Sequence, residues 1–180
     1  MKPGFRTETK DEAHDTAFRI IDANLNRLRE GLRSAEEYFR FSGKGSNADT
    51  AAEFRAVRRL VKQGVSSIPG NILLENRKTE TDPFAEPDPG IDPVRENIED
   101  IVKAGLKRAQ EASRVIEEYS LVIDERIQES GAELSSLFKR VRFKLYNLEK
   151  EIMIRVLREG CIETQRHGGL CSFSQACGYS

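Results

Sequence analysis

The sequence predicts an all-α protein, a pseudo-two-fold four-helix bundle made of two duplicated long helical hairpins that a proline-rich connection joins. Three observations carry this prediction. Apolar residues recur at steps of three and four, which is the helical period. One half of the chain repeats the other. Four of the six prolines lie between Pro83 and Pro93, and none interrupts the periodic segments on either side.

The first hairpin is expected over about 11–66. Its first helix is predicted over about 11–41, because apolar residues form a stripe along one face of this segment. The second helix is predicted from about Thr50, which has capping-box spacing to Glu53, to about Ser66. The stripe of the first helix consists of Ile21, Leu25, Leu28, Leu32, Ala35 and Phe39.

A connection over 67–92 leads to the second hairpin, which is expected over about 93–160. The third helix is predicted over about 93–128 and the fourth over about 130–159. An aspartate before a proline is typical of a helix start, and a glycine is typical of a helix end. The signals used are Asp92 before Pro93, the capping-box pair Ser130 and Glu133, and Gly160.

The last segment, 161–180, is expected to be a mobile tail beside a single helical domain over 1–160. It holds every cysteine of the chain and His167, but their spacing matches no compact zinc site. We therefore favour a mobile tail over a metal site. The cysteines are Cys161, Cys171 and Cys177.

The internal repeat is the strongest pattern in the chain. Residues 20–38 and 101–119, aligned at an offset of 81, share nine identities in nineteen positions. Five of these identities are charged, which indicates that something constrains them. The repeated residues are Ile20, Ala23, Leu25, Arg27, Glu30, Arg33, Glu36, Glu37 and Tyr38, which match Ile101, Ala104, Leu106, Arg108, Glu111, Arg114, Glu117, Glu118 and Tyr119.

Composition excludes several classes of partner. Lysine plus arginine (29) nearly balance aspartate plus glutamate (30), so no strong field favours nucleic acid or an anionic membrane. No apolar run approaches the ~20 residues of a membrane span, and the amino end lacks the apolar stretch of a signal peptide. We therefore expect a cytoplasmic protein. A basic run is interpreted as a solvated face, with an RNA or acidic-protein contact as the weaker reading: Lys139, Arg140, Arg142 and Lys144.

The repeated charges allow two interpretations. Opposite charges three or four residues apart on a helix stabilise each other by ~0.2–0.5 kcal/mol per pair, which would make them a local structural feature. Alternatively, equivalent arginines and glutamates from the two hairpins converge in one pocket, where arginines bind phosphate and carboxylates bind Mg²⁺. No phosphate-binding glycine loop, dinucleotide-binding motif or Glu-x-x-His di-iron motif is present in the sequence.

The stretch RIIDANLNRLREGLRSAEEYFRF over 19–41 and its echo KAGLKRAQEASRVIEEY over 103–119 resemble the paired signature of a known family. That family is a small helical domain frequently fused to thiamine-phosphate synthase, and it is associated with a hydroxymethylpyrimidine-phosphate kinase. The connection fits the family's pattern at Arg77, Thr79 and Asp82, and departs from it at Lys78 and at Pro83 with Phe84. Gly105 stands where the family usually has asparagine.

The resemblance implies a kinase that converts hydroxymethylpyrimidine phosphate to the diphosphate with Mg-ATP in thiamine biosynthesis. No catalytic residue is assigned. The alternative is a non-catalytic helical module whose repeated charges form a structural network between the hairpins. Such a module can be a homodimer. The implied substrate and phosphate ligands are Asn24, Arg27, Arg33, Arg77, Arg108 and Arg114, and the implied metal ligands are Glu30, Glu37, Glu111 and Glu118.

Overall fold

The computed structural model describes residues 9–42, 48–83, 95–123, 127 and 130–166, with 156–166 described by their backbone alone. This part of the chain is helical and contains no strand. None of its helices combines the length and apolar character that a membrane crossing requires. Its five α-helices are α1 (Lys10–Phe41), α2 (Ala48–Ser66), α3 (Gly70–Glu75), α4 (Ile98–Tyr119) and α5 (Gly131–Arg166), with short 3-10 turns at Thr79–Thr81 (η2) and Ser120–Val122 (η3).

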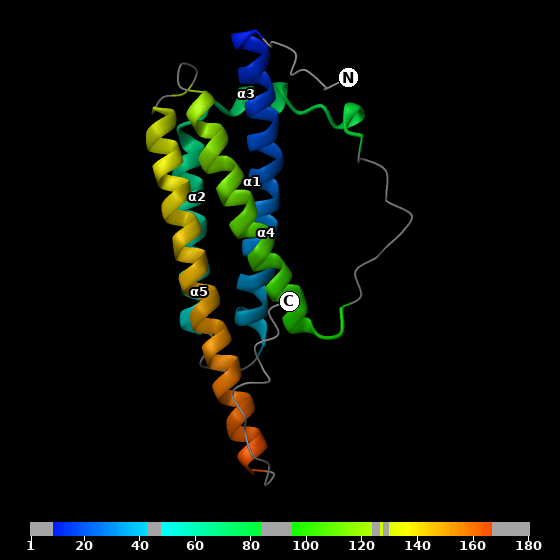
Figure 1. The fold of residues 1–180 in the computed structure, drawn as a ribbon, viewed down its shortest axis with the longest axis vertical. Helices are drawn as coiled ribbons and strands as arrows, with labels where there is room; N and C mark the ends of the chain where they lie inside the picture. Colours follow the sequence, from blue (N-terminus) through cyan, green and yellow to red (C-terminus); the bar gives the residue numbers. More distant parts are fainter. Residues whose placement is uncertain (1–8, 43–47, 84–94, 124–126, 128–129, 167–180) are drawn as a thin grey trace, which may run out of the picture.

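The four long helices pack side by side, as Figure 1 shows. Helix α1 packs mainly against α4, α2 lies beside α1, and α5 lies beside both α4 and α2. Helices α1 and α4 run antiparallel, because Tyr38 near the end of α1 donates a hydrogen bond to Glu99 at the start of α4 (3.1 Å). The stripe predicted for α1 faces the core, since all six of its residues are buried.

Helices α1 and α4 approach each other most closely at two glycines. A Cβ built on Gly31 would overlap the carbonyl oxygen of Gly105, and a Cβ built on Gly105 would lie 3.1 Å from the carbonyl oxygen of Gly31. Both residues are buried. Larger side chains at this crossing would hold the helices apart, so the two glycines set the spacing of the central helix pair.

Several predicted helix boundaries are wrong. Helix α4 begins after Asn97, whose side chain accepts a hydrogen bond from the amide of Asp100 (2.9 Å), so Asn97 is the cap, and the start predicted at Asp92 and Pro93 lies outside the described residues. It ends at Tyr119 rather than near Gln128. The Ser120 hydroxyl bonds to the Ile116 carbonyl, and the chain tightens there into η3.

The predicted end of the fourth helix is also wrong, because α5 continues through Gly160 to Arg166. A glycine inside a helix costs only about 1 kcal/mol relative to alanine, which the remainder of a long helix can bear. The predicted capping box at Ser130 and Glu133 is confirmed, since each side chain accepts the other residue's amide hydrogen. The rest of the cysteine tail, 167–180, lies outside the described residues.

The predicted capping role of Thr50 is wrong as well. Helix α2 begins two residues earlier, at Ala48, so Thr50 lies inside the first turn. Its hydroxyl is buried and accepts a hydrogen bond from Arg155 on α5 (3.0 Å). The side chain therefore joins α2 to α5 instead of capping its own helix. In the connection, the helix α3 and the turn η2 were not predicted.

Candidate functional site

Each hairpin holds a buried glutamate that an arginine of the neighbouring helix binds. In the first, Glu36 on α1 accepts a hydrogen bond from Arg58 on α2 (2.5 Å), and Arg55 lies 3.5 Å from the same carboxylate. In the second, Glu117 on α4 accepts two hydrogen bonds from Arg142 on α5 (2.9 and 3.3 Å). Glu36 and Glu117 are equivalent in the sequence repeat, so this part of the repeated charge set joins the helices of each hairpin.

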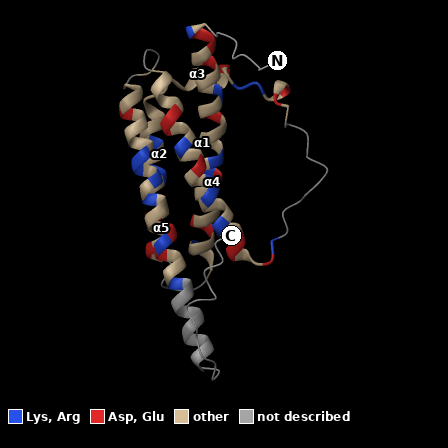
Figure 2. Cartoon of the chain, viewed as in Figure 1, with Lys and Arg blue, Asp and Glu red and all other residues tan. Residues whose placement is uncertain are grey.

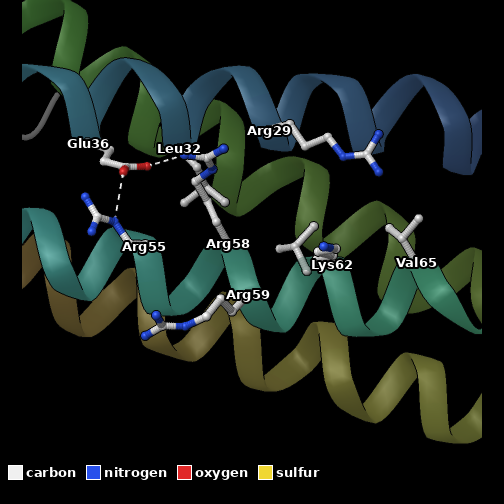
Figure 3. A pocket seen from close by; sticks show the side chains of 9 residues that line it. Arg29, Leu32, Glu36, Arg55, Arg58, Arg59, Lys62 and Val65 are labelled. Atoms are coloured by element: carbon white, nitrogen blue, oxygen red, sulfur yellow. Dashed lines mark hydrogen bonds and ion pairs between the residues drawn. The ribbon is translucent and has the colours of Figure 1, made fainter.

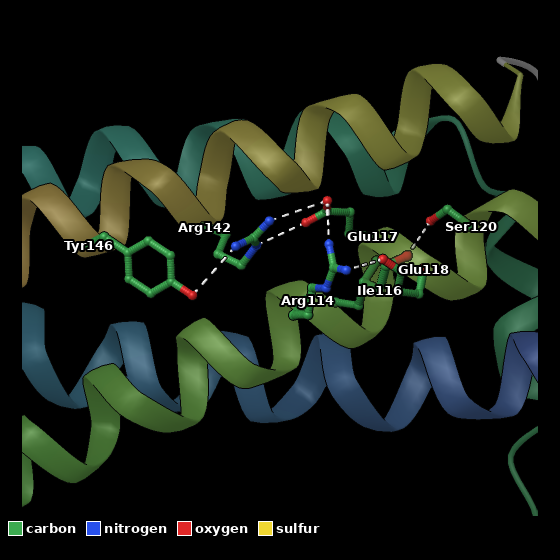
Figure 4. Close-up of polar contacts among 7 residues, drawn as sticks. All are labelled: Arg114, Ile116, Glu117, Glu118, Ser120, Arg142 and Tyr146. Carbon is green, nitrogen blue, oxygen red and sulfur yellow. Dashed lines mark hydrogen bonds and ion pairs between the residues drawn. The ribbon is translucent and has the colours of Figure 1, made fainter.

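Figure 4 shows that the second hairpin surrounds its ion pair with further contacts. Arg114 binds both Glu117 (2.8 Å) and Glu118 (2.6 Å), and the Arg142 guanidinium lies 5.7 Å from the ring centre of Tyr146. The side chain of Arg142 is only 13% exposed. The interpretation of the basic run as a solvated face is therefore wrong for Arg142, because it binds the buried carboxylate. The other three residues of the run are exposed.

The charge of Glu36 makes stability depend on pH. Burial acts to raise its pKa, but the hydrogen bonds and charges of Arg58 and Arg55 outweigh it and hold the pKa below 4.5. The ion pair therefore stabilises the fold above about pH 4.5, and this contribution is lost as the pH falls through the lowered pKa. We expect the difference in melting temperature between the native chain and Glu36→Gln to shrink between pH 6 and pH 3. Parallel melting curves over this range would contradict the assignment.

Several of the predicted binding residues form hydrogen bonds with residues of their own helix. Arg33 bonds to Glu37 (2.6 Å) on α1, an exposed pair one turn apart. Arg114 binds Glu118 in the same way on α4. Asn24 is buried, and its amide donates to the Ile20 carbonyl one turn back (2.8 Å). The roles of these residues as ligands stay a prediction.

Four predicted residues are exposed beside the crossing of α1 and α4. Arg27 and Glu30 lie on α1 before Gly31, and Arg108 and Glu111 lie on α4 after Gly105. At 100° per residue, Arg27 is about 40° around the helix from Gly31, and Arg108 is about 60° from Gly105 in the same sense. Because the two helices are antiparallel, both arginines leave the same side of the pair.

The carboxylates of Glu30 and Glu111 form no hydrogen bond or ion pair with another side chain within the described ranges. The Arg108 guanidinium forms one there, a long hydrogen bond to the Ala104 carbonyl (3.4 Å). Exposed charged groups without partners are available for a ligand. The exposed side of the α1 and α4 pair, with Arg27, Glu30, Arg108 and Glu111, is called the central face below.

The start of the connection is fixed to α1. Arg77 forms two hydrogen bonds with the buried carboxylate of Asp22 (both 2.7 Å), and this contact raises the pKa of Arg77. Arg19, one turn before Asp22, donates to the Lys78 carbonyl (2.7 Å). A bidentate contact between an arginine and a carboxylate fixes the orientation of both side chains and also pairs their charges. The guanidinium of Arg77, predicted as a phosphate ligand, is thus already paired with a carboxylate.

The structure forms no ready-made metal centre in the described part of the chain. No group of three or more histidine, cysteine, aspartate or glutamate side chains there is arranged to hold a metal ion. Glu37 and Glu118 are each paired with an arginine. Mg²⁺ in nucleotide sites is usually held by only one or two carboxylates, with phosphates and water completing its shell. Single carboxylates such as Glu30 and Glu111 fit that kind of site.

Sequence reasoning missed a basic pocket of about 470 Å³ between α1 and α2. In Figure 2, lysine and arginine residues (blue) gather where α2 and α5 overlap in the view. Part of the pocket could have been predicted, because Arg55, Arg58, Arg59 and Lys62 recur at helical spacing. The residues that α1 contributes could not, because their place depends on how the two helices pack. The pocket is lined by Arg29, Leu32, Glu36, Arg55, Arg58, Arg59, Val61, Lys62 and Val65.

Comparison with known proteins extends these observations. The model of the ThiD2 family matches residues 19–151, which include both repeated motifs and the whole connection between the hairpins. The chain belongs to the ThiD2 family. The match spans most of α1, all of α2, α3 and α4, and the larger part of α5, so ThiD2 membership covers both hairpins.

Relatives of this ThiD2 chain carry the name thiamine-phosphate synthase. That of Nostoc punctiforme is 34% identical over 145 residues, which is 80% of this chain and 37% of that protein. That of Gloeobacter violaceus is 36% identical over 134 residues, or 73% and 35% of the two chains. The ThiD2 chain thus spans little more than a third of the length of these relatives. No solved structure matches it.

Proposed function

We propose that this ThiD2 chain transfers the γ-phosphoryl group of ATP to the phosphate of hydroxymethylpyrimidine phosphate, in the presence of Mg²⁺, and so makes the pyrimidine diphosphate for thiamine synthesis. ThiD2 membership and the relatives named thiamine-phosphate synthase support a role in that synthesis. The observation that carries the proposal is the central face, where two equivalent arginines emerge on the same side of a close helix crossing.

The chemistry of phosphoryl transfer suits such a surface. The protein mainly positions the two phosphates and neutralises the charge that they bring together. Arg27 and Arg108 would bind phosphate oxygens, and Glu30 and Glu111 would hold Mg²⁺, which supplies further charge neutralisation when it is bound. Arg77 would act from the connection, where its contact with Asp22 orients it. An oxygen of the substrate phosphate bonds to the γ-phosphorus as the bond to ADP breaks.

The proposal includes the finer architecture, an approximate two-fold relation between the hairpins. The matching ion pairs of Glu36 with Arg58 and Glu117 with Arg142 support it. So does the antiparallel crossing of α1 and α4 at Gly31 and Gly105. A site on the axis of such a bundle takes equivalent residues from both halves, and Arg27 and Arg108 are such a pair.

Replacing Arg27 and Arg108 by alanine is expected to lower kcat/KM for ADP formation by at least about a hundredfold, because each removes a charge-assisted contact worth about 1.5–3 kcal/mol. The melting temperature should stay within about 2 °C of the native value, since both side chains are exposed. Isothermal titration with the pyrimidine phosphate and Mg-ATP, followed by product analysis, measures binding and turnover together.

A variant of the pair Lys103 and Asp100 is the matched control, because it removes an ion pair of α4 without touching any residue predicted as a ligand. No binding and no ADP release by the native chain would reject the kinase. If the chain binds neither substrate and the Arg27 and Arg108 variant unfolds more easily, the alternative of a non-catalytic helical module stands.

A further inference from the structure

The basic pocket between α1 and α2 has no role in the proposed reaction. Figure 3 shows that it follows the groove between the two helices, with Glu36 near one end and Val65 at the other. Five cationic side chains line it against one carboxylate, a formal charge of +4. The cations are Arg29, Arg55, Arg58, Arg59 and Lys62.

The one carboxylate is already engaged. Glu36 is bound by Arg58 and approached by Arg55, and these contacts keep it charged. The side chains of Arg29, Arg59 and Lys62 make no hydrogen bond or ion pair with any other described residue. The pocket therefore keeps its positive charge after the internal pairing is complete.

Repulsion between like charges along α2 opposes this arrangement. Arg55, Arg58, Arg59 and Lys62 stand three and four residues apart on α2, so they form several like-charge neighbours along the helix. Each such pair destabilises a helix by ~0.2–0.5 kcal/mol. An anion seated among them would remove this repulsion, because it gives each cation an opposite charge.

The second hairpin provides an internal comparison, since the same positions there are filled by contacts within the protein. With the second helices aligned at an offset of 84, which matches Arg58 to Arg142, Arg59 corresponds to Phe143 and Lys62 to Tyr146. Both aromatic rings lie near the Arg142 guanidinium, at 5.0 and 5.7 Å.

Two further positions differ in the same way, whereas Arg55 corresponds to another cation, Lys139. Val65 corresponds to Glu149 and Arg29 to Gln110, and these two residues are joined by a hydrogen bond of 2.9 Å. Lys107 also binds Glu149 (2.9 Å). The second groove is thus neutralised from within, whereas the first is left basic.

We propose that the groove between α1 and α2 binds the diphosphate or triphosphate group of a small ligand, at a site separate from the central face. The arginine guanidinium groups suit phosphate oxygens, because each offers two parallel donors. A chain of two or three phosphates carries three or four negative charges near neutral pH, which matches the pocket. Leu32 and Val61 are buried beneath the pocket, and the half-buried Val65 offers apolar surface to the organic part of the ligand.

The test is isothermal titration of the full chain with inorganic pyrophosphate and with tripolyphosphate, in ~50 mM salt and without the pyrimidine or Mg²⁺. We expect one site per chain, and weaker binding of orthophosphate. Arg59→Gln combined with Lys62→Gln should weaken pyrophosphate binding by at least about tenfold. Circular dichroism checks that the variant keeps its helices.

The matched control is Lys139→Gln combined with Lys144→Gln, which removes the same charge from exposed positions on α5 outside the pocket. It should change the affinity by less than about twofold. An equal loss in the control, or no pyrophosphate binding at millimolar concentration, would overturn the proposal.

A third variant separates this site from the proposed kinase site. Arg27→Ala combined with Arg108→Ala should lower kcat/KM for ADP formation by at least about a hundredfold and leave pyrophosphate binding unchanged. Loss of pyrophosphate binding in that variant, with retention in the Arg59 and Lys62 variant, would assign the anion site to the central face and overturn the pocket. Absence of kinase activity in the native chain has no bearing on the titration.

Discussion

Replacing Gly31 by alanine is expected to lower the free energy of unfolding by about 3 kcal/mol, because the new methyl group would overlap the backbone of α4. The contacted atom is the carbonyl oxygen of Gly105, which cannot rotate away as a side chain can. The helices would have to separate, and the buried residues around the crossing would lose contact with each other. Urea unfolding followed by circular dichroism measures the change.

Gly70→Ala is the matched control, because a Cβ at Gly70 meets no atom within 4 Å. It should change the free energy of unfolding by less than about 1 kcal/mol, since only the backbone entropy of the unfolded chain is altered. If Gly31→Ala were as stable as the control, α1 and α4 would not approach as closely as described, and the arrangement of the central face would have to be revised.

Removing the carboxylate of Glu117 is expected to cost about 3–5 kcal/mol, because it leaves the Arg142 guanidinium buried without its counter-charge. The side chains of Glu117 and Arg142 are only 8% and 13% exposed. The variant is Glu117→Ala, and urea unfolding measures its free energy. Replacing Glu117 by leucine and Arg142 by methionine together should restore most of the loss, since no charge is then left unpaired.

Glu118→Ala is the control for this second experiment. Glu118 is the next residue along α4 and also binds Arg114, but its side chain is 50% exposed. Exposed ion pairs of this type contribute at most about 1 kcal/mol, so the variant should be nearly as stable as the native chain. Equal losses for the two variants would show that burial does not govern the energy of this network.

The helices themselves were predictable because their apolar stripes and caps are local features of the sequence. The stripe from Ile21 to Phe39 and the capping box at Ser130 appear in the structure as expected. The helix ends were less predictable. Both Asp92 and Asn97 can cap a helix, and the spacing of the sequence does not show that Asn97 is the cap of α4. It also does not show that α5 continues through Gly160.

Spacing along one helix predicts only some partners of the repeated charges, such as Arg33 with Glu37 and Arg114 with Glu118. Glu36 has Arg33 three residues before it on α1, yet it binds Arg58 from α2. Burial decides this, because a carboxylate facing the neighbouring helix takes its partner from there. The basic pocket could not be predicted for the same reason, because Arg29 is on α1 whereas Arg58, Arg59 and Lys62 are on α2.

Gly31 and Gly105 also affect which hairpins of two different molecules can pack against each other. Under the repeat, the position equivalent to Gly105 in the first hairpin is Asn24. If two copies of the first hairpin met as α1 meets α4, Asn24 would take the place of Gly105, where a Cβ would already lie 3.1 Å from the Gly31 carbonyl oxygen. Pairing of two first hairpins from different molecules is therefore disfavoured, whereas a first hairpin can pair with a second hairpin. This difference between the two hairpins acts against association of molecules through their first hairpins.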